Sequence, residues 1–442
     1  MLLGSHKIDK SSVLTRCRCL ATTPTWRMIL FSVFISLAVC QTIMPDVFAA
    51  TAGSSQVSDR VSRQLLYAQK LMDQKKLQET QKRLIEMLEK NRLHDYEAAV
   101  VYQTLGYVYA ENNDYKNTIK AFEKSLGYDV LSTKVQQSLR LNLGQLYLSL
   151  GDYKKGTSIL EQWRLGEQAH GKNGKKSDHQ IHQLLAIGYY HQQRYKESLP
   201  HLEQVIDNAE QPNKSLYQLA VAIHFELSLY NEAVTLLKRT LKLFPQEKDF
   251  WRQLAYVYRE LDQATSAVAT MSLAYQAGLL NTDDVLLLAR LYLSQQVPYK
   301  AAELIQREIE NGTVSINAES VFLLARSWQQ ARELDKAASS YATLSRLQKN
   351  GKAKFQQAQV YLAMQQWKSA AIALESALDK GLDSNKGRAY LLLGVARYEL
   401  NQLDLAKRAL KMATKINSVK NQALQWLHLV QSSQEEQNAL KF

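Results

Sequence analysis

Histidine is concentrated in one part of this 442-residue sequence. Its side chain binds metals and transfers protons near neutral pH. Five of the nine histidines fall in one stretch: His170, His179, His182, His191 and His201. His179 and His182 are three residues apart, so on a helix they would share a face and permit metal binding. No acidic residue or cysteine joins them at ligand spacing. We therefore interpret these as surface and loop histidines around an inserted turn, and keep a metal carrier or metalloenzyme as an alternative.

The sequence lacks the short motifs of common catalytic chemistry. It holds no glycine-rich phosphate loop, no Gly-x-Ser-x-Gly nucleophile elbow and no Cys-x-x-Cys pair. No stretch outside the repeats described next is long enough for a catalytic domain. We expect a protein that is not an enzyme and that needs no cofactor.

A repeated apolar pattern fills most of the chain. In "WRQLAYVYRE" (251–260), Trp251, Leu254, Ala255 and Tyr258 lie on one face of a helix. A small residue recurs at the position of Ala255, at intervals of 33 to 42 residues: Ala68, Gly106, Gly144, Ala186, Val221, Ala255, Ala289, Ala325, Ala358 and Gly394. A small side chain at this point lets a second helix cross closely, so each unit is predicted to be an antiparallel pair of helices.

Three further positions recur at fixed distances from this small residue. In most repeats an aromatic ring follows three residues later, as in Tyr109 and Tyr258. In most repeats an aromatic residue or leucine that opens the second helix follows nine residues later, as in Tyr115. A second small residue follows after twelve: Gly156, Ser198, Ala233, Ala267, Ala301, Ala337, Ala370 and Ala406. We interpret the repeated tyrosines, leucines and alanines as core residues.

This pattern resembles the tetratricopeptide repeat (TPR) family, whose unit is a helix-turn-helix of 34 residues. The segment "YQTLGYVYAENNDYKNTIKAFEKSL" (102–126) is the best copy, and the resemblance covers residues 58–417. It implies an all-α fold, a right-handed α-solenoid of about ten repeats.

The domain boundaries follow from this pattern and from composition. We predict a signal peptide over 1–49, a linker over 50–57, a degenerate capping repeat over 58–97, a TPR array over 98–417 and a C-terminal capping helix and tail over 418–442. The segment "GEQAHGKNGKKSDH" (166–179) is glycine-rich and basic, so we expect it to be a mobile loop inserted in the array, or else a docking segment for an acidic surface.

The N-terminal segment has the pattern of a secretory signal. Five basic residues precede the apolar run "MILFSVFISLAV" (28–39), and small residues follow it near Ala49. The expected location is therefore the periplasm. An uncleaved inner-membrane anchor and lipid attachment at Cys40 are the alternatives. All three cysteines, Cys17, Cys19 and Cys40, lie in this leader, so we expect no disulfide or thiol chemistry after cleavage.

The resemblance to the TPR family also implies a binding groove, because the first helix of each repeat lines the concave side in that family. Mapped onto this chain, the groove residues are Arg252, Tyr256, Arg259, Arg290, Phe322, Arg326 and Phe355. We expect Arg290 and Arg326 to stack along the groove and to pair with carboxylates, while the aromatic rings supply apolar contact. Such a groove suits an extended peptide with acidic and apolar residues. The alternative is that the arginines are solvated or pair with Asp249, Glu260 and Asp283.

A narrower resemblance concerns residues 241–306 and the segment "ARELDKAASSYA" (331–342). These are similar to exported TPR proteins associated with TonB-type energy-transduction systems of Gram-negative bacteria, through "KLFP" (242–245), "LAYQAGLL" (273–280) and "LARLYLSQQVPYKAA" (288–302). The resemblance implies a periplasmic accessory to TonB-dependent transport that binds a TonB-like protein or inner-membrane motor proteins.

The charge of the chain bears on its partners. Its formal net charge is +13, and an exported basic protein has little access to nucleic acid, so acidic protein segments and peripheral contact with the inner membrane are expected. The alternative function is a TPR scaffold in cell-wall or outer-membrane biogenesis.

Overall fold

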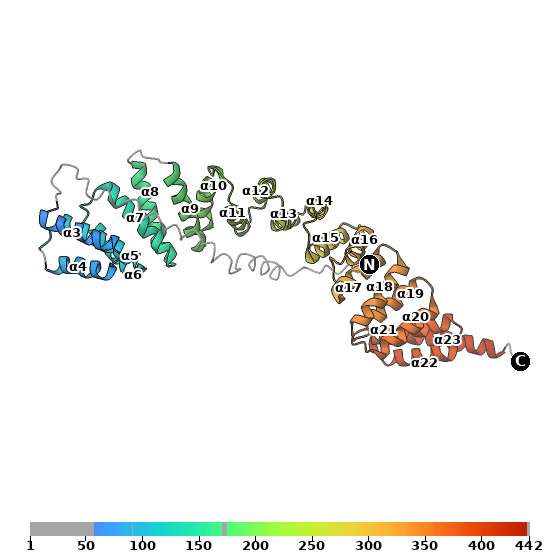
Figure 1. The fold of residues 1–442 in the computed structure, drawn as a ribbon. Coiled ribbons are helices and arrows are strands. Elements are labelled where there is room, and N and C mark those ends of the chain that lie inside the picture. The colour runs from blue at the N-terminus through green and yellow to red at the C-terminus, as the bar shows by residue number, and fades with distance from the viewer. Residues whose placement is uncertain (1–56, 91, 170–174, 440–442) are drawn as a thin grey trace. The chain divides into compact units, whose positions relative to one another are not determined.

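The described part of the chain is entirely helical. The computed structural model describes residues 57–90, 92–169 and 175–439, and over these ranges it has 21 α-helices, one short 3₁₀ helix and no strand (Figure 1). The predicted all-α fold is confirmed. The predicted signal peptide and nearly all of the linker lie outside the described residues. Two compact units divide the chain, one ending at Leu229 and the other beginning at Tyr230, and each is described by itself.

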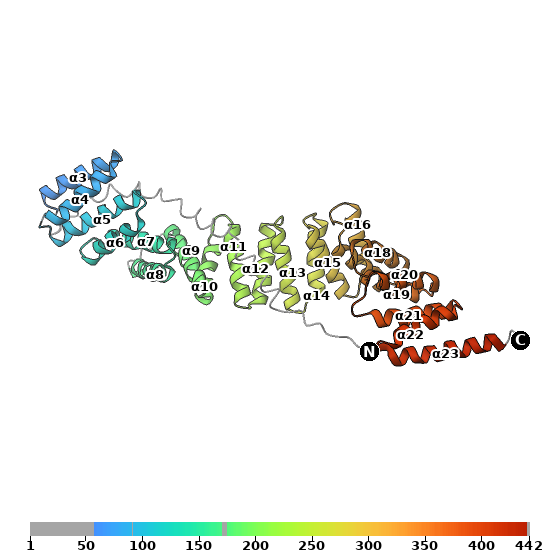
Figure 2. The ribbon, with the colours of Figure 1, turned by 90° about the horizontal axis from the view of Figure 1, so that it is seen from below.

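The helices alternate between the first and second helix of successive repeats. The first helices are α3 (Asp59–Asp73), α5 (Asp95–Glu111), α7 (Thr133–Ser149), α9 (Lys175–His191), α11 (Lys214–Glu226), α13 (Lys248–Glu260), α15 (Thr282–Ser294), α17 (Ala318–Gln330), α19 (Lys352–Ala363) and α21 (Lys386–Glu399). The second helices are α4 (Leu77–Lys90), α6 (Tyr115–Gly127), α8 (Tyr153–Ala169), α10 (Tyr195–Asp207), α12 (Tyr230–Leu243), α14 (Ala264–Gln276), α16 (Pro298–Glu310), α18 (Leu334–Leu347), α20 (Trp367–Asp379) and α22 (Leu403–Thr414). The 3₁₀ helix η3 (Asn417–Val419) and α23 (Lys420–Ala439) follow. In the second unit, Figure 2 shows α12 to α16 as rods lying side by side.

The recurring small residues lie where paired helices cross. Ala255 is 1% exposed, and its counterparts Ala289, Ala325 and Ala358 are fully buried. Gly394 shows how close the crossing is, because a Cβ atom added there would lie 2.5 Å from Leu410 Cγ on the second helix of the same pair. The second small position is fully buried too, from Ala267 to Ala406. Both sets of small residues therefore act as predicted, by allowing close helix packing.

Every turn between paired helices uses the same left-handed residue. It stands seven positions after the small residue: Lys75, Asn113, Gly151, Gln193, Ser228, Asp262, Gln296, Arg332, Gln365 and Asn401 all have positive φ. The next residue then donates its backbone N–H to the carbonyl of the residue five positions before it, as Gln263 does to Tyr258 at 2.7 Å. This closes the first helix with a Schellman-type cap. The second helix opens two residues after the left-handed residue, at Ala264 in this repeat and at Trp367 after Gln365.

The predicted inserted loop is shorter in the structure than in the prediction. Helix α8 continues to Ala169 and α9 begins at Lys175, so both ends of the 166–179 segment are helical, and residues 170–174 lie outside the described ranges. Glutamate, glutamine, alanine and lysine at these ends are good helix formers and extend the neighbouring helices. In the described ranges no helix is both long and apolar enough to cross a bilayer.

Replacing Ala255 by leucine tests the close crossing. We expect Ala255→Leu to lower the free energy of unfolding by about 1–3 kcal/mol, because the larger side chain forces α13 and α14 apart. The matched control is Ala269→Leu, at an exposed position in the middle of α14, which should change stability by less than about 0.5 kcal/mol. Urea unfolding followed by circular dichroism measures both. Equal stability of the two variants would contradict the packing role of Ala255.

Candidate peptide-binding surface

Four arginines occupy equivalent faces of three first helices in the second unit. Arg252 and Arg259 lie on α13, Arg290 lies on α15 and Arg326 lies on α17. Helices α15 and α17 are in direct contact although α16 separates them in sequence. We call these four residues the arginine face.

Arg252 forms ion pairs within the protein. Its guanidinium pairs with Asp249 on the same helix, and its Nε lies 3.5 Å from Oδ1 of Asp284 on α15. Asp284 is 1% exposed and forms a capping box with Asn281, in which each residue accepts a hydrogen bond from the backbone N–H of the other. Arg252 therefore joins α13 to the start of α15. Its pairing with Asp249 was the alternative that the sequence left open.

Arg290 also reaches the next first helix. Its guanidinium pairs with Glu319 in the first turn of α17, and both side chains are largely exposed. This pair crosses from α15 to α17, as the Arg252–Asp284 pair crosses from α13 to α15. An exposed ion pair contributes little to stability, about 0–1 kcal/mol, so an acidic ligand could compete with Glu319 for Arg290.

Arg259 and Arg326 are exposed, and neither makes an ion pair with any described residue. Arg326 lies close to the buried Tyr341 of α18. Burial raises the pKa of Tyr341 to about 12, and the positive charge of Arg326 opposes that rise. The Tyr341 hydroxyl donates to Oε1 of Gln329 at 2.7 Å. Arg259 and Arg326 are therefore the members of the arginine face most available to a ligand.

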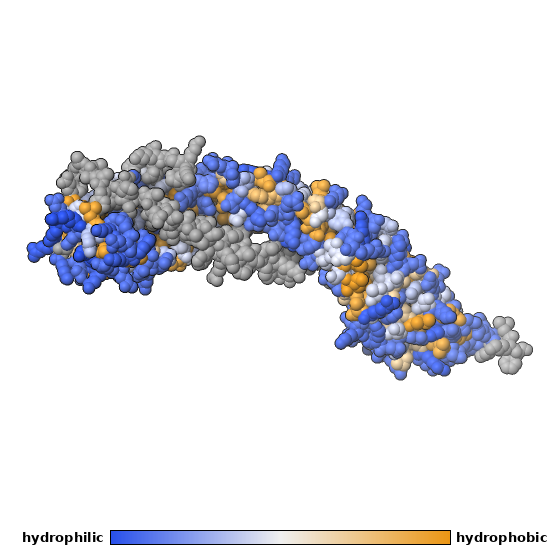
Figure 3. Space-filling view, in the orientation of Figure 1, coloured by the Kyte–Doolittle hydropathy of each residue, from blue (hydrophilic) through white to orange (hydrophobic). Residues whose placement is uncertain are grey.

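The aromatic residues predicted for the groove differ in exposure. Phe322 on α17 is 37% exposed, and Figure 3 shows hydrophobic surface over this helix. Tyr256 on α13 is half-buried. Phe355 on α19 is only 4% exposed and belongs to a core cluster with Leu382, so the prediction that it lines a groove is not met.

The burial of Phe355 has a local cause. Gly351 lies directly before α19, and its N–H donates to the carbonyl of Gly381 at 2.9 Å. A Cβ atom at Gly351 would lie 2.0 Å from the carbonyl oxygen of Ala377, so this turn packs against the end of α20. The turn after α20 then covers the first turn of α19, where Phe355 lies.

Sequence reasoning missed the acidic residues that hold the arginine face in place. Asp283 and Glu260 were the expected partners, whereas Asp284 and Glu319 are the observed ones beside Asp249. Their signal was present in "NTDD" (281–284) and "NAES" (317–320), where an asparagine precedes the first turn of a helix and identifies it.

Two of the clustered histidines meet between α9 and α10. The Nδ1 atoms of His182 and His201 lie 2.7 Å apart, and Nε2 of His201 lies 3.5 Å from Oε1 of Glu161 on α8. His201 is largely buried, so its interpretation as a surface or loop histidine is wrong. His191 stacks on the ring of Tyr153, and His170 lies outside the described residues. The described residues include no group of three His, Cys, Asp or Glu side chains arranged to hold a metal.

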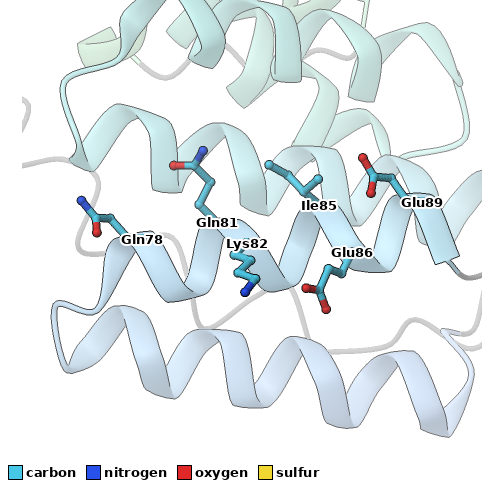
Figure 4. A pocket seen from close by; sticks show the side chains of 6 residues that line it. All are labelled: Gln78, Gln81, Lys82, Ile85, Glu86 and Glu89. Atoms are coloured by element: carbon cyan, nitrogen blue, oxygen red, sulfur yellow. The ribbon is translucent and has the colours of Figure 1, made fainter.

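One shallow depression lies on α4 and has mixed chemistry. Gln78, Gln81, Lys82, Ile85, Glu86 and Glu89 line it, and all come from that one helix (Figure 4). Two acidic, one basic, two amide and one apolar side chain lie along the helix without converging on one point. These side chains do not form a group of similar charge or polarity that would bind a specific ligand.

Comparison with protein families gives the identity of the repeat. Two sequence profiles of the tetratricopeptide repeat match the chain, one over residues 223–278 and 355–418 and the other over 99–129 and 138–162. The chain contains tetratricopeptide repeats in these segments. The TPR fold is typically a non-catalytic scaffold for protein interaction, and TPR proteins bind protein partners. No curated protein sequence matched this TPR protein.

Several solved structures are similar to this TPR protein. The Cut9–Hcn1 hetero-tetramer of the APC/C is 11% identical, with a TM-score of 0.31, over 84% of this chain and 96% of that one. A TPR protein from Parabacteroides merdae is 12% identical, with a TM-score of 0.33, over 61% and 99%. YrrB, described as a TPR protein with an unusual peptide-binding site, is 18% identical, with a TM-score of 0.34, over 41% and 93%.

The histidine contact predicts a specific pH dependence of stability. Burial and the nearby His182 lower the pKa of His201 to about 4, while Glu161 opposes the shift. The unfolded chain, with a histidine pKa of about 6.5, then binds more protons than the folded chain between about pH 6.5 and 4. Stability from this site is complete above pH 6.5 and is lost as the pH falls through that window, by on the order of 2 kcal/mol.

The measurement is the urea midpoint between pH 7 and 4 for the wild type, His201→Gln and the control His428→Gln, whose histidine is exposed on α23. We expect His201→Gln to flatten the dependence and His428→Gln to leave it unchanged. Identical pH profiles for all three proteins would show that His201 is not held neutral by the fold.

Proposed function

We propose that this TPR protein is a non-catalytic scaffold that binds an extended acidic segment of a partner protein through the arginine face. The single observation that carries the proposal is the pair Arg259 and Arg326, exposed cations without an ion-pair partner among the described residues. They stand on α13 and α17, the first helices of the repeats before and after α15, which carries Arg290, and the exposed ring of Phe322 is on the same helix as Arg326. Guanidinium groups bind carboxylates through two parallel hydrogen bonds.

The scaffold is already ordered before it binds. Helices α13 to α17 pack on one another in order, so the helices that present Arg259 and Arg326 are fixed relative to one another, and the ion pairs of Arg252 and Arg290 add to this packing. A rigid surface loses little conformational entropy on binding. Most of the ordering cost then falls on the extended partner.

We propose that the biological setting is the periplasm, where the protein acts as an accessory of TonB-dependent transport. Support comes from the secretory pattern of residues 1–49 and from the resemblance of residues 241–306 to exported TPR proteins of such systems. The partners would be a TonB-like protein or inner-membrane motor proteins. Peripheral contact with the inner membrane is part of the same proposal.

A peptide of alternating glutamate and leucine, twelve residues long, tests the arginine face. We expect Arg259→Ala with Arg326→Ala to weaken its binding at least about tenfold, because two charge-assisted contacts are lost. The control is Arg60→Ala with Arg307→Ala, which removes two exposed arginines elsewhere. Fluorescence anisotropy with a labelled peptide gives the affinities, and binding to the wild type should weaken as salt is raised.

Equal affinity of both double variants for the peptide, with unchanged circular dichroism, would show that the arginine face is not the binding surface. Retention of the wild-type protein on isolated peptidoglycan, with no binding to the peptide, would favour the alternative scaffold role in cell-wall or outer-membrane biogenesis.

A further inference from the structure

The C-terminal part of the second unit has an unusual charge distribution. Residues 336–374 contain six lysines and arginines and no aspartate or glutamate. The turns that lead from one repeat to the next in this region, 346–354, 379–388 and 411–420, carry ten basic residues and two acidic ones, Asp379 and Asp383. The basic residues are Arg346, Lys349, Lys352, Lys354, Lys380, Lys386, Arg388, Lys411, Lys415 and Lys420. We call these ten residues the basic edge.

The three turns form one continuous surface. The first and second are joined by the Gly351–Gly381 hydrogen bond, and Nζ of Lys380 donates to the carbonyl of Ser345 at 2.6 Å. The second and third are joined at Gly387, where an added Cβ atom would lie 2.8 Å from Cγ2 of Ile416. The charges therefore lie along one edge of the stacked repeats.

No acidic side chain among the described residues forms an ion pair with these cations. All ten side chains are exposed except that of Lys354, which is partly buried, and none makes an ion pair with a described residue. Burial lowers the pKa of Lys354, and the positive charges of Lys380 and Arg346 lower it further. The repulsion among these neighbouring positive charges means that binding of an external anion would stabilise the basic edge.

The charge is specific to this part of the unit. The equivalent turns 277–284 and 308–319 contain five acidic residues and no lysine or arginine. A general excess of basic residues in the chain therefore does not account for the basic edge.

We propose that the basic edge docks on the surface of an anionic lipid bilayer. Eight of its ten cations are lysines, and lysine is a flexible point charge that suits mobile head groups, whereas ordered carboxylates favour the fork of arginine. Leu347 and Met412 are exposed directly beside Arg346 and Lys411. Apolar side chains among lysines are typical of surfaces that enter the head-group layer. The charges also lie in a row along the turns, so several of them can contact the flat surface of a bilayer at the same time.

This inference rests on the proposed peripheral contact with the inner membrane and assigns residues to it. It is separate from the peptide partner, because the basic edge and the arginine face share no residue. Failure of one surface can therefore be distinguished from failure of the other.

The test is co-sedimentation of the full chain with vesicles of phosphatidylcholine alone or with 30% phosphatidylglycerol, roughly the anionic fraction at which such electrostatic binding is readily seen. The edge variant changes Lys349, Lys352, Lys386 and Lys415 to glutamine. The matched control changes Lys70, Lys116, Lys120 and Lys300 to glutamine, four lysines that are also exposed. Every protein keeps the same basic and apolar N-terminal segment, whose contribution to vesicle binding is therefore the same in all of them. The comparison uses only the differences in binding to anionic vesicles between the variants.

We expect the edge variant to bind the anionic vesicles at least about tenfold more weakly than the wild type, with the control within about twofold of it. The double variant of Arg259 and Arg326 should bind vesicles like the wild type. Equal vesicle binding by the edge variant and the control would overturn the proposal. So would binding of the wild type, but not of the edge variant, to labelled poly-glutamate while neither protein binds the anionic vesicles, which would mark the edge as a site for an acidic protein.

Discussion

The close approach of two helices at a small side chain is the contact on which the rest of this structure depends. At Ala255, Ala289, Ala325 and Ala358 the side chain is almost completely buried, and at Gly394 even a methyl group would overlap Leu410. The crossing brings the aromatic or leucine side chains of the first helix into contact with the second helix of the pair. The left-handed residue then ends the first helix at the turn, so that the second helix runs back along it. Each pair of helices then buries its remaining apolar faces on its neighbours, so stability is close to a sum of local terms.

The use of these positions for packing determines which residues can bind a ligand. Since the small, aromatic and leucine positions are all used for packing, ligands must be recognised by the residues between them and by the turns. Arg259 and Arg326 lie between the packing positions of their helices, and the lysines of the basic edge lie in or beside the turns. The same register does not guarantee exposure, since Phe322 is exposed on α17 whereas Phe355, at the equivalent position of α19, is covered by the turn after α20.

The sequence predicted the helix pairs, the buried small residues and the first residue of most second helices, because these follow from spacing alone. It did not predict the left-handed residue of each turn, since nine of the ten are not glycine and glycine is the usual signal. It missed the pairing of Arg252 with Asp284 and of Arg290 with Glu319, and the contact of His182 with His201, because these join different helices. The 166–179 segment was predicted as a loop from its glycines, while the helix formers at its ends extend α8 and α9.

Amide hydrogen exchange of the Ala358→Leu variant tests most directly whether the small-residue contact holds the two helices of a repeat together. Ala358 is fully buried in α19, which packs against α18 and α20. The account predicts that protection falls most in α19 and α20, less in α18 and α21, and not measurably in α13 and α14. Equal loss of protection in every helix of the second unit, or no loss in α19 and α20, would contradict it.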